Sequence, residues 1–206
     1  MGNIVKLAVT LGLITVLAAG SLALVNQATR PKIEAYKAEQ QIKARREVLP
    51  AAGEGVYVPS GEESDFPYYT GYAHSDTTEP VGRVFLASAK GYSSTLEMVV
   101  GVDLGGALTG LSIVSQQETP GLGAKITEIR YGESESWFQA QFTGKTRTQL
   151  LVDKDGGRID SITGATISSR AVTDGIRKAL EKLEAQTGAK ETQGTQSSEE
   201  GETVRQ

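Results

Sequence analysis

The most apolar part of the chain is its N-terminal segment. From Leu7 to Val25 no residue is charged, and only three polar side chains interrupt a run of Leu, Val, Ile and Ala. Nineteen residues at about 1.5 Å each reach about 28 Å as a helix, close to the thickness of a bilayer core. The pattern predicts a single transmembrane helix, with residues 1–29 as a membrane anchor.

A cleaved signal peptide is the competing interpretation of this segment. Ser21-Leu22-Ala23 loosely fits a small-residue cleavage site. The apolar run is longer than the ~7–15 residues of a signal core, however, and Lys6 is the only charged side chain before it. The length therefore favours an uncleaved anchor.

Two polar regions, residues 30–66 and 188–206, lie on either side of the middle part of the chain. Residues 30–66 predict a juxtamembrane helix and a loop: 32–49 are rich in Lys, Glu, Gln and Ala up to Pro50, and 51–66 contain Gly, Pro, Ser and acids. Residues 188–206 contain one large apolar residue, Val204. That composition cannot bury enough surface to order itself and predicts a disordered polar tail.

The intervening residues, 67–187, have the pattern of a folded domain. Residues 81–89 are apolar enough for a strand, and 96–102 alternate as a strand does. Asp103-Leu104-Gly105-Gly106 is a turn signal, after which 108–115 return as a second strand of a hairpin.

The second half of this domain combines predicted helices with a short strand. We expect helix in at least part of 125–142, a strand over 146–152 and a turn over 153–157. A last helix is predicted to begin near Ser168 or Ser169. Its apolar face would hold Val172, Ile176, Ala179, Leu180 and Leu183. The predicted fold class is α+β, an antiparallel sheet with packed helices.

Composition narrows the chemistry. A net charge of -4 over 206 residues argues against a nucleic-acid partner. The absence of cysteine excludes disulfides, thiolate zinc sites and cysteine-ligated iron–sulfur clusters, so redox chemistry would require an organic cofactor. His74 is the only histidine, and neither a metal site nor a catalytic triad is expected. Asp153-Lys154-Asp155-Gly156 begins like a calcium loop, but its glycine comes too early.

A first segment with candidate chemistry precedes the last helix. Asp160 is followed by Thr163-Gly164-Ala165-Thr166 and by Ser168, which combine small residues with hydroxyl groups. Small residues allow close approach of the backbone to a ligand, and the start of a helix favours a phosphate. Ordinary helix capping by Ser or Thr explains the same pattern.

A second segment, 118–125, has the composition of a loop with a defined shape. It contains Glu118, Thr119, Leu122, Gly123 and Lys125, with a proline and a further glycine between them. Leu122 at the loop tip would pack on a flat ring, or alternatively plug the core.

Together, the two segments resemble a known family. Thr163-Gly164-Ala165-Thr166 after Asp160 matches the motif that a flavin transferase recognises, and Glu118-Thr119-Pro120-Gly121-Leu122-Gly123 matches the accompanying loop of FMN-binding domains. Trp137-Phe138 and Gln141-Phe142-Thr143-Gly144-Lys145 resemble the segment between them. With one N-terminal membrane helix, this order looks like the G subunits of the Rnf complex, an ion-pumping ferredoxin:NAD oxidoreductase. The C subunit of the sodium-translocating NADH:quinone reductase is similar.

The resemblance implies a cofactor and partners. Thr166 would carry FMN through a phosphoester, beside Thr163, Gly164, Ala165 and Ser168. Leu122 and Gly123 would lie at a ring face, and Glu118, Thr119 and Lys125 would be polar contacts. The chain would relay electrons among the other membrane subunits of the complex, without activity of its own, after maturation by the flavin transferase. The alternatives are the similar subunit of the quinone reductase, or an anchored domain that binds a phosphate ligand noncovalently while Thr166 caps the helix.

Two features of the sequence disagree on which side of the membrane the domain lies. Arg30, Lys32 and Lys37 follow the apolar helix, which by the positive-inside rule favours a cytoplasmic domain. The transferase acts outside the cytoplasm, so the resemblance implies an inner-membrane anchor with the FMN domain on the periplasmic side. The basic flank departs from that expectation.

Overall fold

The computed structural model of the chain describes residues 2–53, 55–61, 66–75 and 77–202, with side chains described up to Gly188. The chain divides into two compact units, Met1–Gln41 and Ile42–Gln206. Helix α1, Gly2–Val48, forms the first unit and continues into the second. The predicted anchor and the predicted juxtamembrane helix are therefore parts of one helix, which contains Pro31.

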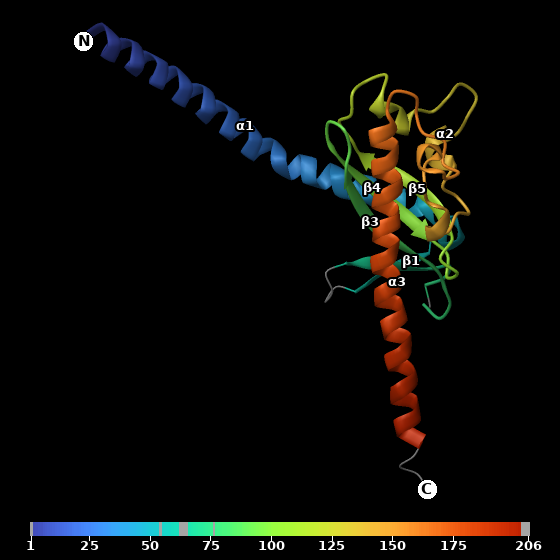
Figure 1. Ribbon diagram of the computed structural model, residues 1–206. Coiled ribbons are helices and arrows are strands. Elements are labelled where there is room, and N and C mark those ends of the chain that lie inside the picture. Colours follow the sequence, from blue (N-terminus) through green and yellow to red (C-terminus); the bar gives the residue numbers. More distant parts are fainter. Residues whose placement is uncertain (1, 54, 62–65, 76, 203–206) are drawn as a thin grey trace. The chain divides into compact units, whose positions relative to one another are not determined.

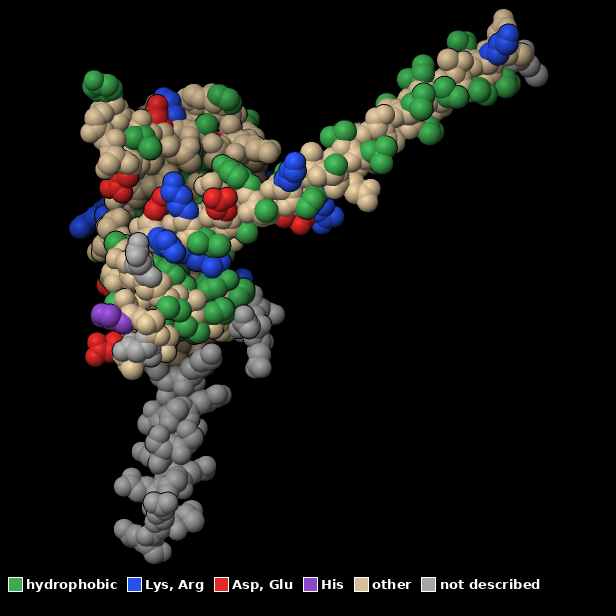
Figure 2. Space-filling view, turned by 180° about the vertical axis from the view of Figure 1, so that it is seen from behind, with side chains coloured by type: hydrophobic (Ala, Val, Ile, Leu, Met, Phe, Trp, Pro, Cys, Tyr) green, Lys and Arg blue, Asp and Glu red, His purple; other side chains and the backbone are tan. Residues whose placement is uncertain are grey.

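Apolar side chains run along the face of the N-terminal part of α1 that Figure 2 shows. Those from Ile4 to Val25 are more than half exposed, so no part of the described chain packs on them. Among the described residues, α1 is the one helix long and apolar enough to cross a membrane. Its length and its uncovered apolar surface fit the predicted single-pass anchor.

The second unit contains a five-stranded antiparallel sheet in which every strand pairs with its neighbours in sequence. The strands are β1 (Val56–Ser60), β2 (Tyr68–Tyr72), β3 (Pro80–Lys90), β4 (Thr95–Val102) and β5 (Leu108–Ser115). Strands β3 to β5 confirm the predicted strand and hairpin. Strand β1 lies in the region predicted as a loop over 51–66, and β2 was not predicted; their register places Tyr57 opposite Gly71 and Val58 opposite Thr70.

The segment after the sheet is less regular than predicted. It holds η2 (Gly123–Thr127), α2 (Trp137–Ala140), η3 (Arg147–Gln149) and η4 (Asp153–Asp155). The helix expected over 125–142 is thus reduced to two short elements, because Gly132 at φ 88° reverses the chain between them. The strand expected over 146–152 is wrong. Thr146 and Gln149 form a reciprocal capping box at the start of η3, so this segment begins a short helix instead. The predicted turn at 153–157 is confirmed by η4 and by Gly156 at φ 81°.

The last helix, α3, runs from Thr166 to Glu202. It begins two residues before the predicted start at Ser168. Its backbone stays helical through most of the segment 188–206, for which disorder was predicted; side chains there are not described, and residues 203–206 lie outside the described part. Disorder of the tail stays a prediction.

Two apolar layers cover the two faces of the sheet. Val172, Ile176 and Leu180 of α3 are buried against Phe85 and Met98, and α3 crosses this face in Figure 1. Because neighbouring strand residues point to opposite faces, Val84 and Val99 lie on the other side. There they pack with Ala44 and Val48 at the end of α1, with Leu49, and with Ala52 of the short helix η1 (Pro50–Ala52). The predicted apolar face of the last helix is confirmed throughout.

Candidate functional site

A cavity of about 430 Å³ opens where the 118–123 loop meets the first turn of α3. Its size is in the range of small-molecule pockets. It is lined by Tyr92, Glu118, Thr119, Leu122, Gly123, Gly164, Ala165, Thr166, Ile167 and Ser168. The two segments singled out in the sequence therefore form one cavity, although they are far apart in the chain.

A tight turn brings the chain into α3. The Ala165 N–H donates to the Ile162 carbonyl at 2.9 Å, and Gly164, the third residue of this turn, has φ 79°. A positive φ at that position is typical of a type II turn and favours glycine. A Cβ atom on Gly164 would also lie 3.1 Å from Leu122 Cδ2. The turn therefore holds the start of α3 against the 118–123 loop.

Thr166 is the first residue of α3 and is half-buried. Within the described part of the chain its hydroxyl has no hydrogen-bond partner, so Thr166 does not cap the helix. Ser169, in the same turn, binds the preceding segment instead: its Oγ accepts from the Ile162 N–H at 3.0 Å and donates to the Ala165 carbonyl at 3.1 Å. Thr166 thus presents a free hydroxyl at the helix start, where backbone N–H groups lack intrahelical acceptors and the helix dipole favours an anion.

Glu118 ties three segments together beneath this cavity. The residue is buried, with 5% of its surface exposed. Oε1 accepts from the N–H groups of Ser93 and Ser94 and from the Ser94 hydroxyl, each at 3.0 Å. Oε2 accepts from the Ser168 hydroxyl at 2.6 Å and from the Tyr92 N–H at 3.2 Å. One carboxylate therefore links the β3–β4 turn, the 118–123 loop and the first turn of α3.

These donors also set the ionisation of Glu118. Burial raises the pKa of the carboxyl, but the hydrogen bonds from Ser168, Ser93 and Ser94 outweigh it and hold the pKa below the ordinary value of 4.5. Glu118 is therefore ionised at neutral pH although it is buried. With its oxygens bound by protein donors, it acts as a positioning residue. Glu118 also lines the cavity, so the cofactor contact expected from the sequence stays a prediction.

Gly123 allows this arrangement by lacking a side chain. A Cβ atom there would lie 2.6 Å from both Glu118 Oε2 and Ser168 Oγ. That is closer than real carbon–oxygen contacts allow, so any larger residue would displace the bond between the two side chains. The glycine predicted as part of the binding loop is thus needed for the contact between that loop and α3.

Three large side chains form an apolar rim around the cavity. Tyr92, Leu122 and Ile167 are 68%, 45% and 52% exposed. Leu122 is therefore not a plug for the core, and the rim suits a flat apolar ring. Sequence reasoning missed Tyr92 and Ile167; the signal for Ile167 was a large apolar side chain directly after the predicted attachment residue.

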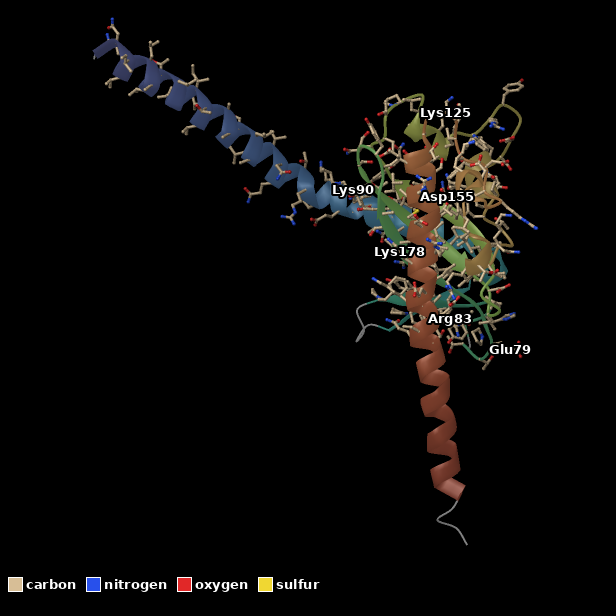
Figure 3. The ribbon with its side chains drawn as sticks, viewed as in Figure 1. Glu79, Arg83, Lys90, Lys125, Asp155 and Lys178 are labelled. Carbon is tan, nitrogen blue, oxygen red and sulfur yellow. The ribbon has the colours of Figure 1, made fainter. Side chains whose placement is uncertain are left out.

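Two predicted site residues do not line the cavity. Thr163 is exposed on the turn before it, and Lys125 lies half-buried in η2, at the end of the domain where α3 begins (Figure 3). Asp160 is exposed, and Gln141 holds its backbone: the Asp160 N–H donates to Gln141 Oε1 at 2.7 Å. The roles expected of Thr163 and Lys125 at the cofactor therefore stay predictions.

Asp153 and Asp155, of the segment that begins like a calcium loop, have structural roles. His74 is exposed. The Ser161 N–H donates to Asp153 at 3.0 Å, and hydrogen bonds from Ser161 and Lys154 lower the pKa of Asp153. Arg170 forms two 2.7 Å hydrogen bonds to Asp155. These contacts hold the η4 turn against α3.

Two family descriptions match the chain. Residues 91–181 match the FMN-binding domain, and residues 1–48 match the RnfG N-terminal region. The first match spans the whole cavity, from the β3–β4 turn to α3, and the second spans α1.

Relatives match over nearly their whole length. The G subunit of the ion-translocating oxidoreductase complex of Methanosarcina acetivorans is 34% identical, covering 90% of this chain and 97% of that protein. The G subunit of the Na⁺-translocating ferredoxin:NAD⁺ oxidoreductase complex of Acetobacterium woodii is 33% identical, with 85% and 89% covered. Among solved structures, the C subunit of the Na⁺-translocating NADH-quinone reductase of Parabacteroides distasonis is similar at 21% identity and a TM-score of 0.49, with 71% and 91% covered.

Proposed function

Because the chain belongs to the family of G subunits of ion-translocating oxidoreductase complexes, we propose that it relays electrons through an FMN group held on Thr166. The observation that carries the proposal is the free hydroxyl of Thr166 at a helix start, on the wall of a cavity with an apolar rim. It acts as a subunit of an oxidoreductase in the manner of the ferredoxin:NAD⁺ relative.

The residues of the cavity fit FMN part by part. The free N–H groups of the first turn of α3 suit the phosphate, which would be esterified to Thr166. Tyr92, Leu122 and Ile167 suit the faces of the isoalloxazine ring. When bound, the flavin supplies the electron transfer, for which the described side chains offer no other redox group.

The chain's own residues fix the geometry of that site. Glu118 holds the β3–β4 turn, and with it Tyr92, at the same wall as Ser168. A phosphoester at Thr166 would leave the ring unsubstituted and prevent loss of the cofactor. The rim side chains are exposed, so the ring edge would stay accessible to a redox partner in the complex.

The noncovalent alternative rests on Thr166 as a helix cap, and the hydroxyl geometry does not favour it. The Thr166 hydroxyl makes no capping hydrogen bond in the described chain, which leaves its oxygen available for a bond to phosphorus. The modified chain has the mass of the protein and FMN less one water; its new bond between Thr166 Oγ1 and phosphorus would form as the phosphoanhydride of a flavin dinucleotide breaks and a nucleoside monophosphate leaves. A flavin transferase would catalyse it, and the exposed Thr163 and Asp160 lie where that enzyme would approach.

The intact mass of the protein tests the proposal. Protein from the native host, or expressed together with a flavin transferase, should carry the mass of FMN less one water. Expression without the transferase gives the unmodified control. An unmodified mass from the native host would exclude covalent FMN and favour the noncovalent alternative.

We further predict that the domain lies outside the cytoplasm. A transferase on that side of the membrane can reach Thr166 only if residues 30–206 are translocated, and flanking Lys and Arg have little influence on a long translocated domain. The chain lacks cysteine, so Ser198→Cys provides a single label in the tail. It should react with a membrane-impermeant maleimide once the outer membrane is permeabilised. Reaction only after rupture of the inner membrane would place the domain in the cytoplasm.

A further inference from the structure

A second hollow, of about 570 Å³, runs along the outer edge of β5. Its walls are the end of α1, the edge of β5 and the irregular segment before and including α2. We call it the edge groove; it is lined by Glu47, Val48, Thr109, Gly110, Leu111, Ser112, Ile113, Thr127, Ile129, Ser134, Glu135, Ser136, Gln139 and Thr143. It shares no lining residue with the cofactor cavity.

The backbone of β5 is already paired at both ends of this groove. The Leu108 N–H donates to the Lys145 carbonyl at 2.9 Å, and the Leu108 carbonyl accepts from the Gly144 N–H at 2.7 Å. At the other end the Ile113 N–H donates to Gln139 Oε1 at 3.1 Å. The side-chain amide of Gln139 thus takes the place of a strand backbone, and it also donates to the Ile126 carbonyl at 3.1 Å.

One residue between these ends directs its backbone N–H and C=O into the groove. Outward N–H and C=O groups of an antiparallel strand recur at every second residue. Since the Ile113 N–H points outward, the N–H and C=O of Leu111 point outward as well. No backbone partner outside the sheet is present for Leu111 in the described chain. From Thr109 to Ser112 the edge spans about 10 Å, at about 3.3 Å per residue, room for a short extended peptide.

The opposite edge of the sheet is less suited to such pairing. Strand β1 carries Pro59, which has no N–H to donate and is a usual way to blunt an edge strand. Strand β5 contains no proline. The two edges therefore differ in their capacity to accept another strand.

We propose that the edge groove binds an extended segment of another subunit of the complex, which pairs with the backbone of β5 at Leu111. This rests on the proposed function, since it requires that the chain works within a complex. The lining residues include two acids, Glu47 and Glu135, and no Lys or Arg. Glu47 also forms an exposed 3.9 Å ion pair with Lys43 of the same helix, so Glu135 is the main acidic contact for a partner. Leu111, Ile113 and Ile129 add apolar surface. The segment is therefore one that places a basic side chain next to an aliphatic one, and it binds by strand addition.

Leu111→Pro tests the pairing directly, with Leu111→Ala as its matched control. Both variants lose the leucine side chain, but only proline removes the outward N–H and fills its place with the ring. The hydrogen bonds to β4 are unaffected, because the backbone groups of the neighbouring residues Gly110 and Ser112 make them. The residue before a proline is sterically restricted, and Gly110, which has no side chain, tolerates this. In cells that make the whole complex, recovery of partner subunits with the proline variant should fall by about tenfold relative to the alanine variant. Equal recovery with both folded variants overturns the proposal.

Hydrogen exchange of the unmodified chain decides the question if the proline variant does not fold. Peptides covering 109–113 should exchange about tenfold more slowly in the assembled complex than in the isolated subunit, as expected for a newly hydrogen-bonded amide. Unchanged exchange overturns the proposal, as does slowing in the isolated subunit that depends on its concentration, which would indicate a second copy in the groove. The flavin mass of the same samples reports on the proposed function separately, because Leu111 lies outside the cofactor cavity.

Discussion

Thr166→Ala is expected to abolish covalent flavin while leaving the domain folded. The substitution removes the one oxygen to which the phosphate would be esterified. It breaks no hydrogen bond, because the Thr166 hydroxyl has no partner in the described chain, and alanine is a better helix former than threonine. The free energy of unfolding should change by about 0.5 kcal/mol or less. In-gel flavin fluorescence should be dark, and thermal unfolding of the unmodified protein should be unchanged.

Two companion variants sharpen this result. Thr163→Ala removes the other threonine of the motif, which is exposed and does not line the cavity, and should keep some flavin. Thr166→Ser retains a hydroxyl at the helix start and should keep part of the attachment. A fluorescent band of normal intensity from Thr166→Ala would move the attachment site elsewhere.

Glu118→Ala is expected to be the most destabilising substitution at the site. It leaves the N–H groups of Tyr92, Ser93 and Ser94 without their acceptor, and it also removes the partner of the Ser168 hydroxyl. Each buried donor left unsatisfied costs about 1–3 kcal/mol. Because water can enter the space left by the side chain and bind some of these donors, we expect the free energy of unfolding to fall by about 3 kcal/mol in total. Denaturant unfolding measures it. The exposed Glu128 provides the control, since Glu128→Ala should change stability little.

The same carboxylate should make stability depend on pH. Its pKa is lower in the folded protein than the ordinary value of 4.5, so the ionised form is favoured by folding. The resulting stabilisation is fully present above the ordinary pKa and is lost as the pH falls through the folded pKa. Glu118→Gln does not titrate, and its stability should fall less between neutral and acid pH. Asp153 and Asp155, whose pKa values are also lowered, keep part of the dependence in both proteins. If the free energy of unfolding falls equally with pH in the two proteins, Glu118 contributes nothing to the pH dependence of stability.

The part of the fold that could be predicted from the sequence is the part with a strict period. Strand β4 alternates and a Gly-Gly turn follows it, so the β4–β5 hairpin was recognisable. Strand β1 was not, because Gly, Pro and acids surround a stretch of only five residues, although Tyr57 and Val58 are typical strand residues. The segment at 146–152 has strand-forming residues, but a local capping box between Thr146 and Gln149 prevails.

For the candidate site, the sequence indicated which segments matter but not how they contact one another. Leu122 and Gly123 were expected at the cofactor, and both line the cavity. The role of Glu118 was not predictable, because its partners at 92–94 and Ser168 are distant in sequence. Tyr92 was missed for the same reason: only folding brings the β3–β4 turn to the start of α3.

The order of the strands bears on how the domain folds. In a sheet where each strand pairs with its sequence neighbour, most contacts are local, and such hairpins form in about 1–10 μs. The hydrogen bond between Glu118 and Ser168 joins residues 50 positions apart in the chain, and the packing of α3 on β3 joins residues that are further apart still. Closing these loops costs entropy that the hairpins do not require. We therefore expect the sheet to form first and the docking of α3 to limit the rate, so that the cavity is completed in the last step of folding.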